Sequence, residues 1–365
     1  MTELATAVCA QPFRLGLVIG QLSAGGAEGQ LALLCRDLDR ARVLPTVYCL
    51  SGQSLPYGPR IEATGTPVRY LLGSRVSRTR LLRHWFKADA IELVHAWLYI
   101  ANGYTWMANC GGGRPMITSA RNCKVQGRLS RLTNVAAFRA SRAIVVNSRD
   151  VADYIARYYR APHERIHVVY NAIDTQRFAP APADGVDRIV TVGRLVEQKN
   201  HALFLRAAAQ LARELPSVHF VIVGDGPLRP QLEAQAQQLG IGDRVCFTGE
   251  RTDVETVLAG SALFWLTSRW EGLPNVVLEA MASGVPVIAT DVGGTRELIQ
   301  SGVDGFVVAA DDAESFVHHS YACLTDPELR RRLAVAARAR AEAFSSTRMV
   351  GTLVQLYEQV IGRGH

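Results

Sequence analysis

The chain has 365 residues, of which 48% are hydrophobic and 20% are charged. This length and composition suit one large or two ordinary globular domains, and they exclude a disordered chain, a collagen and a disulfide-stapled miniprotein. The charge is uneven, because residues 1–170 hold 22 basic and 10 acidic residues whereas the remainder holds 18 and 23. The first half is therefore strongly basic and the second half mildly acidic.

The seven cysteines are scattered along the chain and include no C-x-x-C pair. We therefore expect neither a zinc site nor a disulfide framework, and a reducing cytoplasm is the natural location. Residues 1–13 lack the apolar stretch of a secretory signal. The most apolar window, residues 93–110, is interrupted by His95, Asn102 and Asn109, so we predict no membrane-spanning helix.

Short apolar runs alternate with stretches of helical periodicity along the first half of the chain. Such alternation predicts βαβ units and a parallel sheet that is covered on both faces. The predicted helices include residues 30–40 and 131–139. The predicted strands are residues 15–20, 46–50, 68–72, 93–95, 116–119, 143–147 and 166–170.

The same alternation restarts after residues 171–186, a segment rich in proline and alanine that is typical of a linker. The second set of predicted strands is residues 188–192, 218–223, 245–248, 263–267, 285–289 and 306–308. The helices expected between them are residues 202–213, 228–239, 274–282 and 296–300. The tail, residues 327–362, has a helical pattern and no strand.

The repeated pattern predicts an α/β protein with two doubly wound, Rossmann-like domains and a C-terminal helical extension. We place the first domain at residues 1–172, the second at 173–345, and at 346–365 a final helix that packs back toward the first domain. In such folds ligands bind beyond the carboxyl ends of the strands, and two such crevices can face each other across a cleft. A G-x-G-x-x-G after a strand, a Walker sequence and a G-x-S-x-G elbow are all missing from the sequence. Dehydrogenases, ordinary ATPases and α/β-hydrolases are therefore disfavoured.

Two glycines, Gly25 and Gly26, stand between the first strand and an amphipathic helix. Glycines at this place let backbone amides approach a bulky anion, and the helix N-terminus adds partial positive charge. A plain strand-to-helix turn is an equally good interpretation of this segment alone.

A second candidate site follows the first strand of the second half, where Gly193 and Arg194 precede Lys199. Two cations in a loop are usually solvated. Lys199, however, is one of three lysines in a chain with 37 arginines. An ammonium is a compact point charge, whereas a guanidinium is a planar fork. We therefore favour an anion-binding site at Arg194 and Lys199.

A third candidate site is the stretch of residues 268–281, in which Glu271 and Glu279 flank the start of a predicted helix. Pro274 suits the first helical position, so the amides of residues 275–277 should lack partners inside the helix. The side chain of Glu279 tilts back toward the helix start. Carboxylates accept hydrogen bonds from neighbouring hydroxyls, as on a sugar or ribose. An ordinary core helix with an exposed glutamate would explain Glu271 or Glu279 alone, but it does not explain both together.

These motifs together resemble the retaining glycosyltransferases of family 4, which have the GT-B fold, and the resemblance covers nearly the whole chain. Its most specific element is the spacing of Glu271 and Glu279, two glutamates separated by seven residues. The sequence departs from the family at His95-Ala96-Trp97, where many members carry two residues of the His or Ser type. Other matching segments are Gly193-Arg194 with Lys199, 224–227, 248–251, 293–297, 25–28, His95, Arg121-Asn122 and 171–174.

The resemblance implies a nucleotide-diphosphate sugar as the donor, with a UDP-sugar favoured, held mainly by the second domain. Glu279 would accept hydrogen bonds from the ribose hydroxyls and Glu271 from sugar hydroxyls. Arg194 and Lys199 would neutralise the leaving diphosphate, so that no metal ion or other cofactor is needed. The other donor-binding positions that the resemblance implies are Gly25, Gly26, Gly193, Arg251, Gly272, Leu273, Asn275 and Val276.

The basic first half should receive the acceptor. The resemblance implies that His95 lies near the transferred sugar and that Arg121, Asn122 and Lys124 lie on the acceptor side. Residues 72–87 carry five cations beside two aromatic residues, which suits an anionic membrane surface. A solvated face that merely reflects the arginine-rich composition is the alternative. Nucleic acid is a poorer partner, because no recognised nucleic-acid-binding motif accompanies the charge.

We therefore expect a retaining, metal-independent glycosyltransferase that moves a sugar to a lipid-linked or anionic glycan acceptor, in the synthesis of cell-envelope polysaccharide or glycolipid. It would be cytoplasmic and peripheral on the inner face of the cytoplasmic membrane. A sugar-nucleotide epimerase of the same shape is the first alternative, and it would release a changed sugar nucleotide without any acceptor. A non-catalytic glycan-binding protein is the second, and the intact Arg194, Lys199, Glu271 and Glu279 argue against it.

Overall fold

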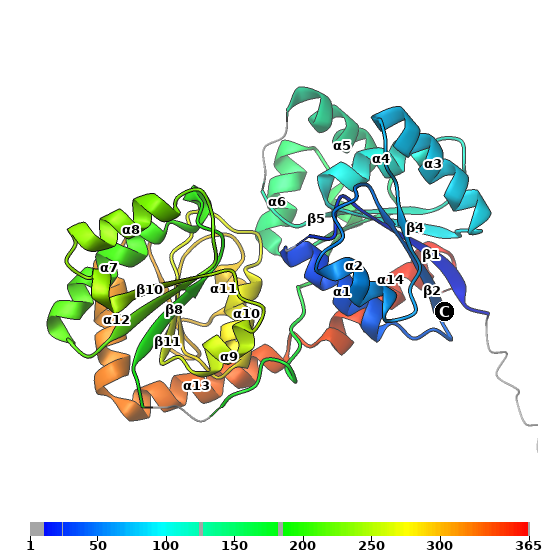
Figure 1. The fold of residues 1–365 in the computed structure, drawn as a ribbon. Coiled ribbons are helices and arrows are strands. Elements are labelled where there is room, and N and C mark those ends of the chain that lie inside the picture. The colour runs from blue at the N-terminus through cyan, green and yellow to red at the C-terminus, as the bar shows by residue number, and fades with distance from the viewer. Residues whose placement is uncertain (1–10, 24, 124–126, 182–184, 364–365) are drawn as a thin grey trace, which may run out of the picture. The chain divides into compact units, whose positions relative to one another are not determined.

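The computed structural model describes residues 11–23, 25–123, 127–181 and 185–363, and the chain divides into two compact units (Figure 1). The first unit comprises Met1–Asn147, Ala152–Val169 and Met349–His365. The second comprises Ser148–Val151 and Tyr170–Arg348. The main division lies after residue 169 rather than after residue 172, and the end of the chain belongs to the first unit by its contacts.

The described part of the first unit contains a seven-stranded parallel sheet in the order β3-β2-β1-β4-β5-β6-β7. All strands predicted for this half are present, because short continuous apolar runs suit strands that are buried on both faces. The strands are β1 (Phe13–Ile19), β2 (Val43–Cys49), β3 (Val68–Tyr70), β4 (Leu93–Trp97), β5 (Met116–Ala120), β6 (Ala143–Val146) and β7 (Ile166–Val168).

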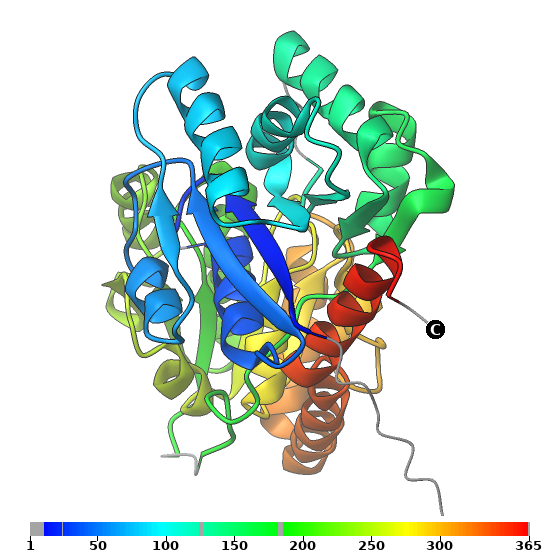
Figure 2. The ribbon, with the colours of Figure 1, turned by 90° about the vertical axis from the view of Figure 1, so that its right-hand side faces the viewer.

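Helices cover both faces of this sheet. In Figure 1, α3, α4 and α5 lie on one face, and α1, α2 and α14 lie on the other. Figure 2 shows α14, in red, beside the start of β1, in dark blue, where the rings of Phe13 and Tyr357 meet edge to face at 6.5 Å. The helices are α1 (Gly26–Asp37), α2 (Tyr57–Glu62), α3 (Arg75–Ala88), α4 (Leu98–Asn109), α5 (Arg128–Ala140), α6 (Arg149–Tyr158), η1 (His163–Arg165) and α14 (Ser346–Val360).

The described part of the second unit contains a six-stranded parallel sheet in the order β10-β9-β8-β11-β12-β13. The strands are β8 (Arg188–Val192), β9 (His219–Val223), β10 (Val245–Gly249), β11 (Leu263–Leu266), β12 (Val287–Thr290) and β13 (Phe306–Val308). The helices are η2 (Glu197–Lys199), α7 (His201–Glu214), α8 (Arg229–Gln238), η3 (Gly242–Arg244), α9 (Val254–Ala259), α10 (Asn275–Ala282), α11 (Thr295–Leu298), α12 (Ala313–Thr325) and α13 (Pro327–Glu342).

Two hydrophobic clusters, one on each face, hold this second sheet between its helices. Residues of α7, α8 and α12 surround the buried rings of Phe204, Phe220, Trp265 and Phe316. Residues of α9, α10 and α13 form the other cluster, which includes Leu278. The helix that carries Glu279 therefore packs its apolar side directly on the sheet.

The predicted linker, residues 171–186, is packed against the second unit over its first part. Ile173 and Phe178 are each 5% exposed. Arg338 of α13 donates hydrogen bonds to the carbonyls of Phe178 and Thr175 at 2.7 and 3.0 Å. The linker prediction is wrong for these residues, because the proline content further along the segment obscured their apolar character.

Several helix limits differ from the sequence prediction. Helix α1 begins at Gly26 rather than at residue 30, because its glycine-rich first turn carries no apolar periodicity. The helical tail is two helices, α13 and α14, which are separated at residues 343–345. Within the described residues, no helix is both long enough and apolar enough to cross a membrane.

Candidate active site

Gly193, Arg194 and Glu271 of the predicted site lie beyond the carboxyl ends of β8 and β11, whereas Arg251 follows β10 and Glu279 lies on α10. These two strands are neighbours, and the strand order reverses between them. Ligands of doubly wound sheets bind at such a reversal. Gly193 and Arg194 directly follow β8, and Glu271 lies in the loop that follows β11. The topology therefore brings two separate sequence motifs to one place.

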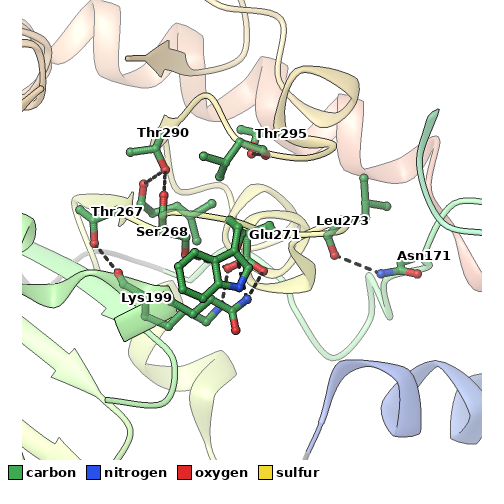
Figure 3. Close-up of polar contacts among 12 residues, drawn as sticks. Asn171, Lys199, Thr267, Ser268, Glu271, Leu273, Thr290 and Thr295 are labelled. Atoms are coloured by element: carbon green, nitrogen blue, oxygen red, sulfur yellow. Dashed lines mark hydrogen bonds and ion pairs between the residues drawn. The ribbon is translucent and has the colours of Figure 1, made fainter. Parts of the chain in front are cut away.

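Lys199 and Glu271 form an ion pair at this place (Figure 3). Lys199 Nζ lies 2.6 Å from Glu271 Oε1, and the Ser268 hydroxyl donates to the same oxygen at 2.7 Å. Gln198 Nε2 donates to Glu271 Oε2 at 3.4 Å. Only 19% of the lysine side chain and 9% of the glutamate side chain are exposed, so water screens this pair less than a surface pair. Each residue is the counter-ion of the other in this structure.

Gly193 makes room for the stem of the lysine. A Cβ at this position would stand 3.0 Å from Lys199 Cε and 3.2 Å from Lys199 Cδ, so a side chain there would press on the lysine stem. Gly224 packs against the carbonyl of Gly193 in turn, and its φ of +132° lies in the region that favours glycine. The two glycines explain how a long side chain can cross the end of β8.

Hydroxyl groups hold the first part of the loop that carries Glu271. Thr267 Oγ1 donates to the carbonyl of Lys199 at 3.0 Å, which ties the loop to the lysine itself (Figure 3). Thr290, at the end of β12, donates to the carbonyl of Ser268 at 2.7 Å. These contacts fix both partners of the ion pair to one framework.

Gly272 and Leu273 are held from the other side of the same loop. The amide of Gly294 donates to the carbonyl of Gly272 at 2.7 Å. A Cβ at Gly293 would collide with the backbone of residues 271 and 272, and its φ of +52° is left-handed. Asn171 Nδ2 donates to the carbonyl of Leu273 at 3.2 Å (Figure 3). Segments 171–174 and 293–297, which the sequence marks without a role, therefore support the loop.

The helix that carries Glu279 begins one residue later than predicted. Pro274 is an extended N-cap with ψ of 106°, and α10 begins at Asn275. The carbonyl of Pro274 accepts a hydrogen bond from the amide of Val277 at 3.1 Å. The expectation that this amide lacks a partner in the first turn is therefore wrong. Asn275 and Val276, both half-buried, form the first turn as expected.

Glu279 is partly buried on the second turn of α10. Burial raises the pKa of its carboxyl group to about 7, and the positive charges of Arg177 and Lys199 act against that rise. The carboxyl group therefore changes charge near neutral pH. In its ionised form it can accept hydrogen bonds from two neighbouring hydroxyls.

The two arginines predicted for the donor side have different surroundings. Arg194 is exposed directly after β8. Arg251 is exposed as well, and its Nη2 forms an ion pair with Asp253 Oδ2 at 2.5 Å. The backbone before it turns sharply, since Gly249 has a φ of +72°. A backbone contact at residues 249–251 stays a prediction.

In the first unit, Gly25 is the extended N-cap of α1 and Gly26 is its first residue. A Cβ at Gly25 would collide with the carboxylate of Glu28, which is 5% exposed. Glu28 therefore folds back over the helix start. Sequence reasoning gave Glu28 no role, although a carboxylate three residues after the N-cap has capping-box spacing.

His95 is the middle residue of β4 and is 0% exposed. Its Nδ1 lies 2.8 Å from the Tyr357 hydroxyl, and its Nε2 lies 2.6 Å from Ser119 Oγ. Burial and the charge of Arg121 lower the pKa of His95 to about 3, so the ring is neutral at physiological pH. Both ring nitrogens are engaged within the unit. The sequence gave no sign of Tyr357 or Ser119.

Arg121 and Trp97 stack at the ends of the neighbouring strands β5 and β4. The guanidinium carbon lies 4.1 Å from the centroid of the indole, and Arg121 is 7% exposed. Burial lowers the pKa of Arg121 to about 10, so it remains a cation at neutral pH. Asn122 is exposed, and its carbonyl accepts a hydrogen bond from Tyr99 at 2.7 Å. Lys124 lies outside the described residues.

The chemistry that the second unit can perform follows from these groups. Two carboxyl groups can accept hydrogen bonds from hydroxyls, and the Lys199 ammonium and the exposed Arg194 guanidinium are cations that can neutralise an anion. Over the described part of the chain, no group of three or more His, Cys, Asp or Glu residues is placed to hold a metal ion.

Comparison with known families identifies the chain. Residues 24–177 match the model described as Glycosyltransferase Family 4, and residues 172–340 match the model described as Glycosyl transferases group 1. The chain belongs to glycosyltransferase family 4. The resemblance inferred from the motifs is confirmed, and the two models meet where the chain passes from the first unit to the second.

Solved structures confirm the fold of this family member. HepE of Anabaena, crystallised in complex with UDP, has a TM-score of 0.85 at 22% identity, covering 95% of this chain and 100% of that one. The sucrose-phosphate synthase of Thermosynechococcus elongatus has a TM-score of 0.83 at 19% identity, covering 96% and 99%. The chain therefore has the predicted GT-B fold.

Curated relatives match over shorter stretches. The Vi polysaccharide biosynthesis protein VipC/TviE of Salmonella typhi is 34% identical over 57% of this chain and 39% of its own length. An Escherichia coli protein, the UDP-Gal:alpha-D-GlcNAc-diphosphoundecaprenol alpha-1,3-galactosyltransferase, is 30% identical over 60% of this chain and 61% of its own length. These matches thus span less than two thirds of each relative. The putative glycosyltransferase EpsD of Bacillus subtilis is 29% identical over 80% of this chain and 74% of its own length.

Proposed function

We propose that this protein is a retaining hexosyltransferase that moves a sugar from a UDP-sugar to a lipid-linked or anionic glycan acceptor without a metal ion. One observation supports this above all. The half-buried pair of Lys199 and Glu271 stands beside Glu279 at the strand reversal of the second unit. A cation for a diphosphate and two carboxyl groups for hydroxyls are the groups that a nucleotide sugar requires.

Lys199 would stabilise the leaving diphosphate. As the bond between the anomeric carbon and the diphosphate oxygen breaks, negative charge grows on that oxygen. The ammonium has three donors, so it can hold Glu271 with one and the diphosphate with another. Arg194 adds a second, exposed cation. Fixed cations in a site of low exposure can stabilise such charge by several kcal/mol.

Glu271 and Glu279 would bind different parts of the donor. Glu271, fixed by Ser268 and Lys199, would accept hydrogen bonds from sugar hydroxyls. Glu279 would accept them from the ribose. The acceptor hydroxyl would bond to the anomeric carbon on the face from which the diphosphate leaves, and its proton would pass to the diphosphate oxygen. This course retains the configuration, as the family resemblance implies.

The identity of donor and acceptor is supported by relatives. HepE was crystallised with UDP and with UDP-glucose, and the Escherichia coli relative uses UDP-Gal and a diphosphoundecaprenol acceptor. A Campylobacter jejuni relative, 30% identical over 56% of this chain, is also named for a diphospho-undecaprenol substrate. We therefore favour a UDP-sugar and a polyprenyl-diphosphate-linked acceptor.

Incubation with UDP-, GDP- and ADP-sugars in excess chelator tests the proposal. Nucleoside diphosphate should be released from UDP-sugars, and release should require a lipid-linked acceptor. Loss of activity in chelator with rescue by Mn²⁺ or Mg²⁺ would overturn the metal-independent part. A changed sugar nucleotide formed without acceptor would instead establish the epimerase alternative.

The two glutamates should be separable by calorimetry. Glu279→Ala is expected to weaken the binding of both UDP and the UDP-sugar, because the ribose is common to the two ligands. Glu271→Ala should weaken mainly the UDP-sugar. Both titrations on both variants check this, and equal losses for bare UDP would contradict the division of roles.

Donor binding should also depend on pH through Glu279. Only its carboxylate form accepts two hydroxyl hydrogen bonds, and its pKa lies at about 7. Affinity for a UDP-sugar should therefore fall as pH falls, by up to about tenfold between pH 8 and pH 6, since one pH unit below the pKa leaves about one tenth of the group ionised. A UDP-sugar is the right ligand, because its esterified diphosphate does not titrate in this range. Glu279→Gln should bind it weakly with no such slope.

The layer of α3, α4 and α5 is the surface that we propose for membrane contact (Figure 1). The cations Arg75, Arg80, Lys87 and Arg128 are exposed there. Large apolar side chains of the same three helices are exposed as well, namely Val76, Leu81, Ile100, Leu129 and Leu132. Val76, Arg80 and Lys87 recur at helical spacing, so they share one face of α3. We call these nine residues the α3–α5 surface.

Three residues expected at this surface serve the fold instead. Phe86 is 0% exposed and belongs to the core, and Trp85 is half-buried with Arg69 stacked on its ring at 3.8 Å. Arg83 donates to the carbonyls of residues 107, 108 and 110, where it caps the end of α4. The interfacial anchors are therefore the exposed aliphatic residues, not the aromatic pair.

A further inference from the structure

Asn200 forms the turn that directly follows Lys199, and its backbone is left-handed. It is the N-cap of α7 with φ of 48° and ψ of 46°, whereas an N-cap residue is ordinarily extended. Asparagine is one of the few residues besides glycine that enter this region often. The left-handed residue joins the end of η2 to the start of α7, so it sets the direction in which the chain leaves Lys199.

The side chain of Asn200 is not used to cap this helix. Within the described residues, no amide of α7 donates a hydrogen bond to it, although asparagine is among the preferred capping residues. Asn200 Nδ2 instead donates to Asp311 Oδ1 at 2.9 Å, and Asn200 is 6% exposed. Helix capping therefore does not explain why an asparagine stands at this position.

Asp311 lies in the loop between β13 and α12, and its φ of +60° is left-handed as well. Helices α7 and α12 pack against each other (Figure 1), and both follow strands of one parallel sheet, so both begin at the same edge of that sheet. Arg206 Nη2 lies 3.6 Å from Asp311 Oδ1, but this pair is exposed and contributes little. Two left-handed residues that are 111 positions apart thus hold each other through the bond to Asn200.

The place of the Lys199 ammonium depends on this turn. The lysine stem passes close to Gly193, where a Cβ would stand 3.0 Å from Lys199 Cε, so the side chain has little room to compensate for a shift of its backbone. Thr267 Oγ1 holds the carbonyl of Lys199 at 3.0 Å. The bond between Asn200 and Asp311 holds the chain just beyond that carbonyl.

We propose that Asn200 and Asp311 are positioning residues that fix the turn after Lys199 and so keep its ammonium at Glu271 and at the leaving diphosphate. Both residues act through Lys199 and take no part in bond formation or proton transfer. The inference rests on the proposed glycosyl transfer for its kinetic consequence, but not for the placement of the ammonium at Glu271.

Nuclear magnetic resonance of the full-length protein with ¹³C at lysine Cε tests that placement directly. The chain has only three lysines, and the Lys199 signal is the one that Lys199→Gln removes. A lysine that is held in one position gives its two Hε hydrogens separate shifts, whereas a mobile lysine averages them.

Glycine is the replacement of choice at both positions, because it keeps the left-handed backbone and removes only the side chain. We expect separate Hε shifts for Lys199 in the unaltered protein, and merged shifts in Asn200→Gly and in Asp311→Gly. Merged shifts in the unaltered protein, or separate shifts retained in both variants, would overturn the proposal.

Steady-state kinetics test the consequence for the reaction. In Asn200→Gly and Asp311→Gly, kcat should fall by about threefold to tenfold with KM for the UDP-sugar within about twofold, because a displaced ammonium matters most where charge grows on the diphosphate. The double variant should be no slower than either single one, since both changes remove the same hydrogen bond. Additive losses would contradict the proposal.

Asp311→Asn is the conservative variant. It keeps an acceptor oxygen for the amide of Asn200, and asparagine also tolerates left-handed backbone. We therefore expect kcat within about twofold of the unaltered protein. A loss as large as that of Asp311→Gly would show that the hydrogen bond to Asn200 is not what matters.

Asp326→Gly is the matched control for a merely structural role. Asp326 is the N-cap of α13 in the same unit, and its carboxylate accepts hydrogen bonds from the amides of Glu328 and Leu329, each at 3.0 Å. Its loss should lower the melting temperature at least as much as Asp311→Gly does, with kcat within about twofold. Equal kcat values in Asp311→Gly and Asp326→Gly would refute positioning. If the unaltered protein transfers no sugar, the proposed function fails, and the lysine spectrum still decides the placement of the ammonium.

Discussion

Lys199→Ala is expected to lower kcat/KM for the UDP-sugar by more than about tenfold, which corresponds to about 1.4 kcal/mol of transition-state stabilisation. The substitution removes the cation that faces the leaving diphosphate. It also leaves Glu271, whose side chain is 9% exposed, without its counter-ion. Steady-state kinetics on the folded variant measure the effect, and affinity for the donor should fall with it because the bound diphosphate is already charged.

Arg269→Ala is the matched control for this substitution. Arg269 lies on the same loop, and its Nη1 pairs with Glu197 Oε1 at 2.8 Å with 43% of the arginine side chain exposed. The substitution Arg269→Ala removes one positive charge, as Lys199→Ala does, but from a solvated ion pair, so kcat/KM should stay within about twofold of the unaltered protein. If kcat/KM fell by similar factors in the two variants, Lys199 would contribute only a general positive charge and no specific contact with the diphosphate.

Lys199→Arg distinguishes a point charge from a planar one. The stem of Lys199 passes where a Cβ at Gly193 would stand, at 3.0 to 3.3 Å from three of its carbons. A guanidinium is wider and forks, so it should not reach Glu271 Oε1 along the same path. We expect Lys199→Arg to lose most of the activity, which would explain a lysine in a chain with 37 arginines.

The strands could be predicted from the sequence because their signal is local. Each buried parallel strand is a short apolar run, and the order of runs and helical stretches determines the fold class. Helix starts were less visible. The first turn of α1, residues 26–29, has no large apolar side chain to start the helical pattern. Pro274 fits an N-cap as well as a first helical position, so the sequence could not decide between them.

The site residues could be predicted only where they belong to one short sequence motif with a recognisable spacing. Glu271 and Glu279 flank the start of one helix, and Arg194 and Lys199 both come shortly after one strand, so each pair is visible in a short stretch of sequence. The pairing of Lys199 with Glu271 joins residues 72 positions apart, and that of His95 with Tyr357 joins residues 262 positions apart. No local pattern marks a tyrosine on the last helix as a partner of a strand in the first unit. Such contacts arise only from tertiary packing.

Binding to anionic liposomes should depend on the α3–α5 surface. Each Lys or Arg near an anionic leaflet contributes roughly 1 kcal/mol, and the attraction fades over a Debye length of about 10 Å at 0.1 M salt. We expect sedimentation with anionic liposomes at low salt, little with neutral ones, and marked weakening as salt is added. Replacing Arg75, Arg80, Lys87 and Arg128 together by glutamine should weaken binding by at least about tenfold.

The control must change net charge equally, because the chain as a whole carries +7. Arg206, Arg213, Arg331 and Arg332 are exposed in the second unit, and their joint replacement by glutamine removes the same charge elsewhere. If binding depends on place rather than on total charge, this control should still sediment. Leu129→Ser with Leu132→Ser tests the apolar part, since each side chain is about two-thirds exposed, at 65% and 66%. A protein that ignores anionic liposomes at low salt would refute membrane contact and leave the donor site untouched, because Lys199, Glu271 and Glu279 all belong to the other unit.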